Sequence, residues 1–222
     1  MAKQSFFTST IGRKYAMALS ALFLLVFLLQ HFFINFTSVL SKETFNSLSH
    51  FMGNNILVQF IMQPILIIGV IFHFVMGFIL EIKNNSARQS KYVMFKGNAN
   101  STWMSRNMIW TGLVVLAFLA LHFYDFWFPE MDYKYIAQNA PDANRYYEEL
   151  VHKFEDPFRV GFYVLAFAFL ALHLLHGFQS SFQSLGANHE RWTPVIKGLG
   201  TAYAIVIPLG FIFIALFHHF SH

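Results

Sequence analysis

Cysteine is absent from all 222 residues of this chain, and charged residues are scarce. Without cysteine, the chain can form no disulfide bond, no covalently attached c-type haem and no thiolate-held iron–sulfur cluster of its own. Only 12% of its residues are charged, which is about half the share that is usual in soluble domains. A nucleotide-binding loop is also missing, because "GLG" at 198–200 lacks the preceding strand and the third glycine. These absences argue against a soluble enzyme.

Apolar side chains are abundant instead: 56% of the residues are hydrophobic and 29 are phenylalanine. The charges cluster between apolar runs of about 20 residues, the length that crosses a bilayer as a helix. The first run is too long for a signal peptide and no cleavage pattern follows it, so we expect it to be retained. The sequence predicts an all-α integral membrane protein, a single membrane domain over residues 1–222. Its five transmembrane helices are expected at 15–36, 56–80, 107–128, 161–182 and 195–220.

The distribution of lysine and arginine predicts the orientation. Most of these residues fall in the N-terminal segment and in the second and fourth connections, which we therefore expect on the cytoplasmic side. The N-terminus is then cytoplasmic and the C-terminus outside. The third connection, the outer loop at 129–157, is mainly acidic. Within it, "PDANRYYEELVHKF" predicts a short amphipathic helix started by Asp142.

Histidines inside the apolar runs are the main candidates for function. Each of the first four spans contains one, and these are His31, His73, His122 and His173. A buried histidine can be a hydrogen-bonded packing residue, but a polar group within the membrane is costly and usually serves function. The other histidines lie at or beyond the span ends, and we expect most of them to be solvated: His50, His152, His189, His218, His219 and His222.

Depth groups these four histidines into two pairs. Because successive helices alternate in direction, His31 and His122 lie about equally far before the outer ends of their spans. We call them the outer pair. His73 and His173 lie similarly close to the inner ends of theirs and form the inner pair. Two facing imidazoles at each of two depths is what two bis-histidine b-type haems require, so we predict these four histidines as the axial iron ligands.

Glycines strengthen the prediction for the inner pair. "HFVMG" and "HLLHG" place Gly77 and Gly177 four residues after His73 and His173, on the same helix face. A residue without Cβ lets a flat macrocycle approach the backbone, although glycine also serves ordinary packing of membrane helices. Since His173 has the spacing of His73, we interpret His176 as a neighbouring group that donates to a haem propionate or to another helix. The outer pair lacks such a glycine and is assigned from depth alone.

Three further residues carry weaker predictions. Arg106, at the inner end of the third span, either neutralises a propionate of the inner haem or acts as a positively charged membrane anchor. Asp125, one turn beyond His122, is a candidate for contact with a quinone or for capping a helix end. Gln30 is a second quinone candidate.

At this point the chain resembles a known family over nearly its whole length. It is similar to the membrane-anchor cytochrome b subunit of succinate:quinone oxidoreductases and quinol:fumarate reductases, in the single-chain form with five helices and two haems. The resemblance rests on one histidine in each of the first four helices. It also rests on four motifs: "LLQHFF", "HFVMG", "TGLVVLAFLALH" and "HLLHGFQSSFQSLG". In such proteins the second and fourth helices hold the inner haem, and the first and third hold the outer one.

The resemblance implies a function and a set of partners. The chain would pass electrons from an iron–sulfur subunit, through two haems b, to a quinone, for which menaquinone is expected. A flavoprotein subunit with covalently bound FAD would interconvert succinate and fumarate on the cytoplasmic face of a bacterial inner membrane. Partners would thus be these two subunits, the quinone and membrane lipid, with no nucleic acid, and the whole complex can form a higher oligomer.

One position departs from part of the family. Some fumarate reductases of this type have a glutamate two residues before the fourth-helix ligand, thought to carry compensating protons, and Ala171 stands there in this chain. We therefore favour succinate dehydrogenase, with a quinol:fumarate reductase as the alternative. A second alternative is the cytochrome b subunit of nitrate reductase or hydrogenase. That protein concentrates its haem ligands on fewer helices, so the even spread of histidines over four helices in this chain disfavours it. A metal-ion transporter and a purely structural membrane protein are the remaining alternatives.

Overall fold

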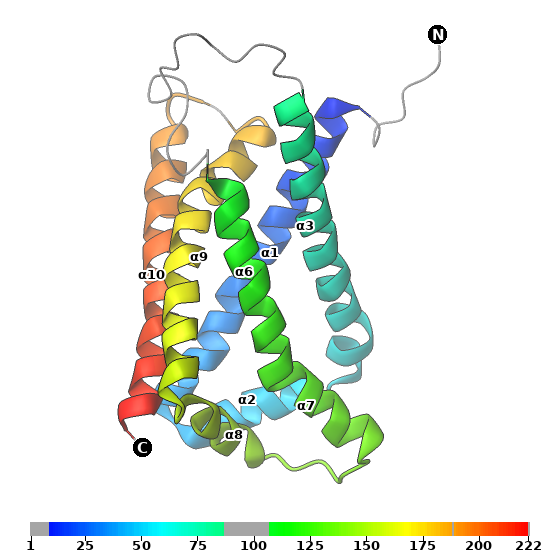
Figure 1. Cartoon of the computed structure of the whole chain (residues 1–222), viewed down its shortest axis with the longest axis vertical. Coiled ribbons are helices and arrows are strands. Elements are labelled where there is room, and N and C mark those ends of the chain that lie inside the picture. The colour runs from blue at the N-terminus through cyan, green and yellow to red at the C-terminus, as the bar shows by residue number, and fades with distance from the viewer. Residues whose placement is uncertain (1–8, 87–106, 188, 222) are drawn as a thin grey trace.

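A computed structural model describes residues 9–86, 107–187 and 189–221. These residues are largely helical and contain no strand (Figure 1). Five helices are long and apolar enough to cross a membrane, as the sequence predicts, and they give the chain the character of a multi-pass membrane protein. Their bounds are α1 (Thr10–Leu40), η2 (Val58–Met62) continued by α3 (Gln63–Ser86), α6 (Met108–His122) and its extension, α9 (Pro157–Ser184) and α10 (Thr193–Phe220). The start of α1 and the end of α10 lie at opposite ends of the bundle.

The third spanning helix is longer than the sequence predicts. After α6 it continues through η3 (Phe123–Trp127), α7 (Phe128–Met131) and η4 (Asp132–Ile136). The predicted loop at 129–157 therefore begins as helix, and its start was wrong. A proline inside a helix clashes with the carbonyl of the residue four positions earlier, so we expected the helix to end just before Pro129. The π-helical turn η3 comes directly before it, as η2 comes before Pro64, and the wider turn accommodates each proline without ending the helix.

Two shorter helices, α2 (Lys42–Asn54) and α8 (Arg145–Phe154), lie across one end of the bundle (Figure 1). We call this the α2/α8 end. The sequence predicts α8 but starts it at Asp142. In the structure, Asp142 accepts a hydrogen bond from the Asn144 N–H in the turn before the helix. Helix α2 was not predicted. Its buried Asn46 accepts a bond from the Tyr147 N–H at 2.8 Å, and so caps the first turn of α8 from another helix.

The buried core lies mainly at the interface of α1, α9 and α10. Its larger cluster is on the side of α2 and α8 and includes Phe32, Phe154, Tyr163, Phe167 and Phe211. A smaller cluster of Leu25, Leu174 and Ala204 lies further along the same three helices. By contrast, no residue in the most apolar stretch of the second spanning helix is buried. Helix α3 therefore lies at the edge of the bundle and packs against α1 and α6.

Candidate functional site

The structure brings the two histidines of the outer pair into direct contact. His31 comes from α1 and His122 is the last residue of α6. Their ring centroids lie 5.8 Å apart and the ring planes are nearly perpendicular, at 87°. A metal–imidazole bond is about 2 Å long, and each centroid lies a ring radius beyond its nitrogen. These lengths place two imidazoles on opposite sides of one metal ion slightly more than about 6 Å apart, centroid to centroid, so the observed separation is close to this distance but a little shorter.

Aromatic rings surround the outer pair. Phe27 stacks on His31 with 5.4 Å between centroids, and Phe118 stacks on His122 at 5.7 Å. Phe211 of α10 also contacts His31. Among the described residues, the buried Nδ1 atom of His122 has no hydrogen-bond partner. A buried polar atom without a partner is costly, so this apolar site holds an imidazole whose hydrogen-bonding capacity is not met by the described residues.

The inner pair lies nearer the opposite end of the bundle. His73 of α3 and His173 of α9 lie close enough for their rings to interact electrostatically. The Nδ1 atom of His73 lies 3.1 Å from the Ser20 hydroxyl of α1. The Nδ1 atom of His173 lies 3.3 Å from the Thr111 hydroxyl of α6. These hydroxyl contacts at Nδ1 leave the Nε2 atom of each ring for another ligand.

The two pairs lie at different levels along the bundle. Ser20 marks the inner level on α1, and Thr111 marks it on α6. His31 and His122 follow these residues on the same helices after an equal number of positions. At 1.5 Å of rise per residue, the levels are roughly 16 Å apart along the helix axes. The pairing and the two-level arrangement agree with the sequence analysis, whereas iron ligation itself stays a prediction.

The two glycines of the inner motifs lie against methionine side chains. A Cβ built on Gly77 would lie 3.7 Å from the Met17 methyl carbon, and one on Gly177 would lie 3.3 Å from that of Met108. Both neighbours are the flexible ends of long side chains, which can move if a larger group is bound. His176 is partly buried and interacts electrostatically with His173. Its role near a propionate stays a prediction.

The weaker candidates differ in their surroundings. Gln30 is exposed on α1, where its amide contacts the Met52 sulfur of α2 at 3.7 Å. Asp125 is 1% exposed and bonded to α9. It accepts a hydrogen bond from the Tyr163 hydroxyl at 2.9 Å, and it is ion-paired with Arg159 at 3.3 Å. Both of its oxygens therefore face protein groups, which favours a role in joining η3 to α9. Arg106 lies outside the described residues.

His218 departs from the expectation for the terminal histidines. It is 0% exposed, and its Nε2 atom lies 2.9 Å from the Ser38 hydroxyl of α1. Its position near the end of the last span suggested solvation, but the end of α10 packs beneath Tyr147 of α8. Contacts with α1 and α8 therefore bury this residue.

Comparisons with protein-family models, with curated proteins and with solved structures found no match to this chain. Its function is therefore inferred from its residues and their geometry. Among the described residues, no group of three or more His, Cys, Asp or Glu side chains converges on a metal-sized site. A haem iron needs only two axial protein ligands, so a facing histidine pair is sufficient for it. The two histidine pairs supply this number of ligands at each of two levels, and haem binding stays a prediction.

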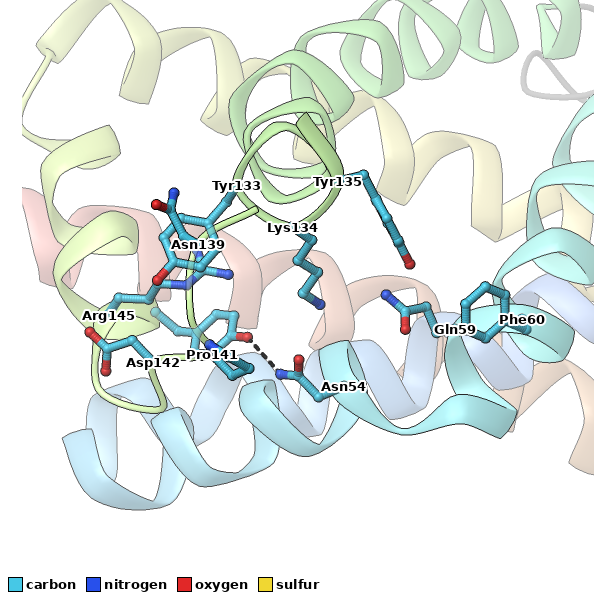
Figure 2. Close-up of a pocket in the computed structure, with 11 residues that line it drawn as sticks. Asn54, Gln59, Phe60, Tyr133, Lys134, Tyr135, Asn139, Pro141, Asp142 and Arg145 are labelled. Atoms are coloured by element: carbon cyan, nitrogen blue, oxygen red, sulfur yellow. Dashed lines mark hydrogen bonds between the residues drawn. The ribbon is translucent and has the colours of Figure 1, made fainter. Parts of the chain in front are cut away.

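A pocket of about 220 Å³, lined mainly by residues with polar or charged side-chain groups, opens at the α2/α8 end (Figure 2). It is lined by none of the four predicted ligands. Lys134 extends from η4 into this region, where it donates to the Gly53 carbonyl oxygen at 2.5 Å and pairs with Glu130. The other residues that line it are Asn54, Gln59, Phe60, Tyr133, Tyr135, Asn139, Pro141, Asp142, Arg145 and Tyr146.

Arg145 organises the wall of this pocket. It pairs with Glu130 and Glu149, and its guanidinium lies over the rings of Tyr133 at 4.0 Å and Tyr146 at 4.4 Å. Burial lowers the pKa of Arg145, but the hydrogen bonds to the two carboxylates outweigh it and raise the pKa above its usual value. The Arg145 side chain therefore stays positively charged, and Glu130 and Glu149 neutralise that charge locally. This arrangement favours a structural role for Arg145 in linking α7 to α8.

Proposed function

We propose that this chain is the dihaem cytochrome b membrane anchor of a succinate dehydrogenase, passing electrons from an iron–sulfur subunit to menaquinone. The proposal is supported by a pairing of histidines from different helices at each of two levels in a five-helix bundle. The His31 and His122 rings are in contact, and His73 and His173 lie close enough to interact electrostatically. Two haems b would supply reversible one-electron transfer along the bundle. Four intramembrane imidazoles on four helices are otherwise a costly arrangement for a membrane protein.

The residues of the chain have distinct tasks in this proposal. His31 and His122 would hold the outer haem within a shell of aromatic rings that excludes water. His73 and His173 would hold the inner haem, with Gly77 and Gly177 leaving the backbone accessible on the next turn. His176 and Arg106 remain candidates for the propionates. Gln30 and Asp125 remain the quinone candidates, although the contacts of Asp125 with α9 favour its structural role.

The partners and the location follow from the chemistry that the chain lacks. It has no cysteine for an iron–sulfur cluster, so the electron donor must be another chain. The basic N-terminal, second and fourth segments favour docking of the iron–sulfur and flavoprotein subunits at a cytoplasmic face. The proposed location of the complex is a bacterial inner membrane, with the N-terminus of this chain inside. Succinate oxidation itself would occur on the flavoprotein.

Ala171 supports succinate oxidation over fumarate reduction. It lies two residues before His173, where a glutamate would be needed for the compensating proton transfer expected of some fumarate reductases. The same subunit in a quinol:fumarate reductase is the second candidate. An electron-transfer anchor of another quinone-linked oxidoreductase would use the same histidine pairs but a different soluble partner.

Purification of the native complex tests the proposal. A tagged chain extracted in mild detergent should copurify with one chain that carries covalent FAD and one that carries iron–sulfur clusters. The complex should reduce a menaquinone analogue with succinate, and a His31→Ala, His73→Ala double variant should lose this activity. Copurification with a molybdenum or nickel enzyme would assign the chain to another oxidoreductase. A haem-free chain without either partner would contradict the proposal.

A further inference from the structure

Each histidine of the inner pair meets a hydroxyl group from a neighbouring helix. Ser20 of α1 lies 3.1 Å from Nδ1 of His73, and Thr111 of α6 lies 3.3 Å from Nδ1 of His173. Both hydroxyls are within the spanning region, and Thr111 is only 2% exposed. The two contacts therefore join α1 to α3 and α6 to α9 at the level of the proposed inner haem.

The direction of these hydrogen bonds can be deduced from the rest of the hydroxyl contacts. The Ser20 hydroxyl donates its only proton to the Met17 carbonyl at 2.8 Å. The Thr111 hydroxyl donates to the Met108 carbonyl at 2.9 Å. A hydroxyl has one proton, so each oxygen must accept from the imidazole. The proton of the neutral ring is then on Nδ1, and the Nε2 lone pair is free.

The contact between a hydroxyl and a histidine of the inner pair occurs twice, with the same types of residue around it. On α1 and α6, a methionine precedes the hydroxyl residue by three positions and supplies its carbonyl acceptor. The methyl groups of the same two methionines, Met17 and Met108, are the atoms nearest to a Cβ built on Gly77 and Gly177. The outer histidine then follows the hydroxyl residue at the same spacing in both helices. The same set of contacts therefore surrounds both histidines of the inner pair.

We propose that Ser20 and Thr111 are positioning residues for the inner haem, which hold His73 and His173 in the Nδ1–H tautomer. This inference rests on the proposed function. An acceptor at Nδ1–H fixes the orientation of a ligating imidazole and makes its other nitrogen more basic. A more basic ligand stabilises oxidised iron over reduced iron. The two hydroxyls thus lower the potential of the inner haem.

The outer pair lacks this device among the described residues. Nδ1 of His122 has no hydrogen-bond partner there, and Asn35 lies 3.4–3.5 Å from the His31 ring nitrogens while donating to the His31 carbonyl. An amide N–H is a donor, so it cannot accept from an imidazole. Loss of either hydroxyl should therefore affect one haem and leave the other unchanged.

Redox titration of the purified holoprotein, followed by visible spectroscopy, tests the proposal. Ser20→Ala and Thr111→Val should each move the potential of one haem, the same one, to a more positive value, and the double variant should move it further. Ser20→Thr and Thr111→Ser keep a hydroxyl and should restore the wild-type potential. Ser181→Ala is the matched control, because Ser181 is 4% exposed and its hydroxyl bonds only to the Phe178 carbonyl in the described contacts.

The outcomes separate this inference from the proposed function. Two bound haems with both potentials unchanged in Ser20→Ala and Thr111→Val would overturn the positioning role and leave the dihaem proposal intact. Loss of one haem in Ser20→Ala that Ser20→Thr reverses would support the role. Loss of that haem in both Ser20→Ala and Ser20→Thr would overturn the positioning role, because a variant that keeps the hydroxyl would then fail to keep the haem. A wild-type chain without haem would overturn both.

Discussion

At the residue scale, two histidines three positions apart on α9 have different surroundings. His173 faces the Thr111 hydroxyl and the imidazole of His73. No hydrogen bond of His176 occurs among the described contacts, and its ring is only partly buried. Residues three apart on a helix share a side of it but not one direction. Among the described contacts, His173 is thus the one of the two that interacts with a histidine of α3, and we predict it as the iron ligand.

Replacement of each histidine by alanine distinguishes their roles. His173→Ala should lose one haem, because no second axial ligand faces His73 at that level. His176→Ala should keep both haems with a shifted potential of the inner one. His218→Ala is the control, since His218 is 0% exposed, lies beside Ser38 near the end of α10 and is not one of the four predicted ligands. Haem quantitation checks all three, and loss of a haem from His176→Ala alone would make His176 the ligand.

The histidine pairs could be predicted from the sequence because helix direction and depth are properties of each span by itself. The surroundings of the pairs could not. Ser20 and Thr111 look like ordinary membrane-helix residues, and only the packing of α1 on α3 and of α6 on α9 brings them to the imidazoles. The sequence does show a hydroxyl residue at the same spacing before His31 and before His122. That spacing could not identify Ser20 and Thr111 as contacts of the inner pair, because these contacts depend on how neighbouring helices pack.

At the element scale, the five spanning helices follow from their length and apolar composition, but their limits do not. Pro129 predicted that the third spanning helix ends before it. The π-helical turn η3 (Phe123–Trp127) instead lets the helix continue to Ile136. Helix α2 was not predicted because its 13 residues mix polar and apolar side chains and are too few for a membrane span. Its stability comes from Asn46 and from packing over α8, which are tertiary contacts.

Two glycines near the start of α10 test how closely the helices are packed. A Cβ on Gly200 would lie 2.7 Å from Cδ1 of Phe178 on α9, whereas one on Gly198 meets nothing within 4 Å. Gly200→Ala should destabilise the fold by about 1–3 kcal/mol through overpacking. Gly198→Ala should be neutral or stabilise it by up to about 1 kcal/mol. Thermal unfolding in detergent, followed by circular dichroism, measures both, and equal stabilities would contradict the tight contact of α9 with α10.

At the scale of the whole molecule, the bundle is divided into two levels with different characters. The level of His31 and His122 lies within the larger aromatic core, next to the end closed by α2 and α8. The level of His73 and His173 has the smaller core and the two hydroxyl contacts. Helix α3 contributes no buried residue in its apolar stretch, so the inner level is the more open of the two. This asymmetry predicts that the two haems differ in potential.

Haem quantitation on the purified wild-type chain, together with reduced-minus-oxidised spectra, tests the central claim most directly. Two facing histidine pairs predict two low-spin b-type haems per chain, which titrate at two separate potentials. The ratio of non-covalent haem to protein should therefore be two. One haem per chain would contradict the assignment of four ligands, and a chain that binds none would contradict the account as a whole.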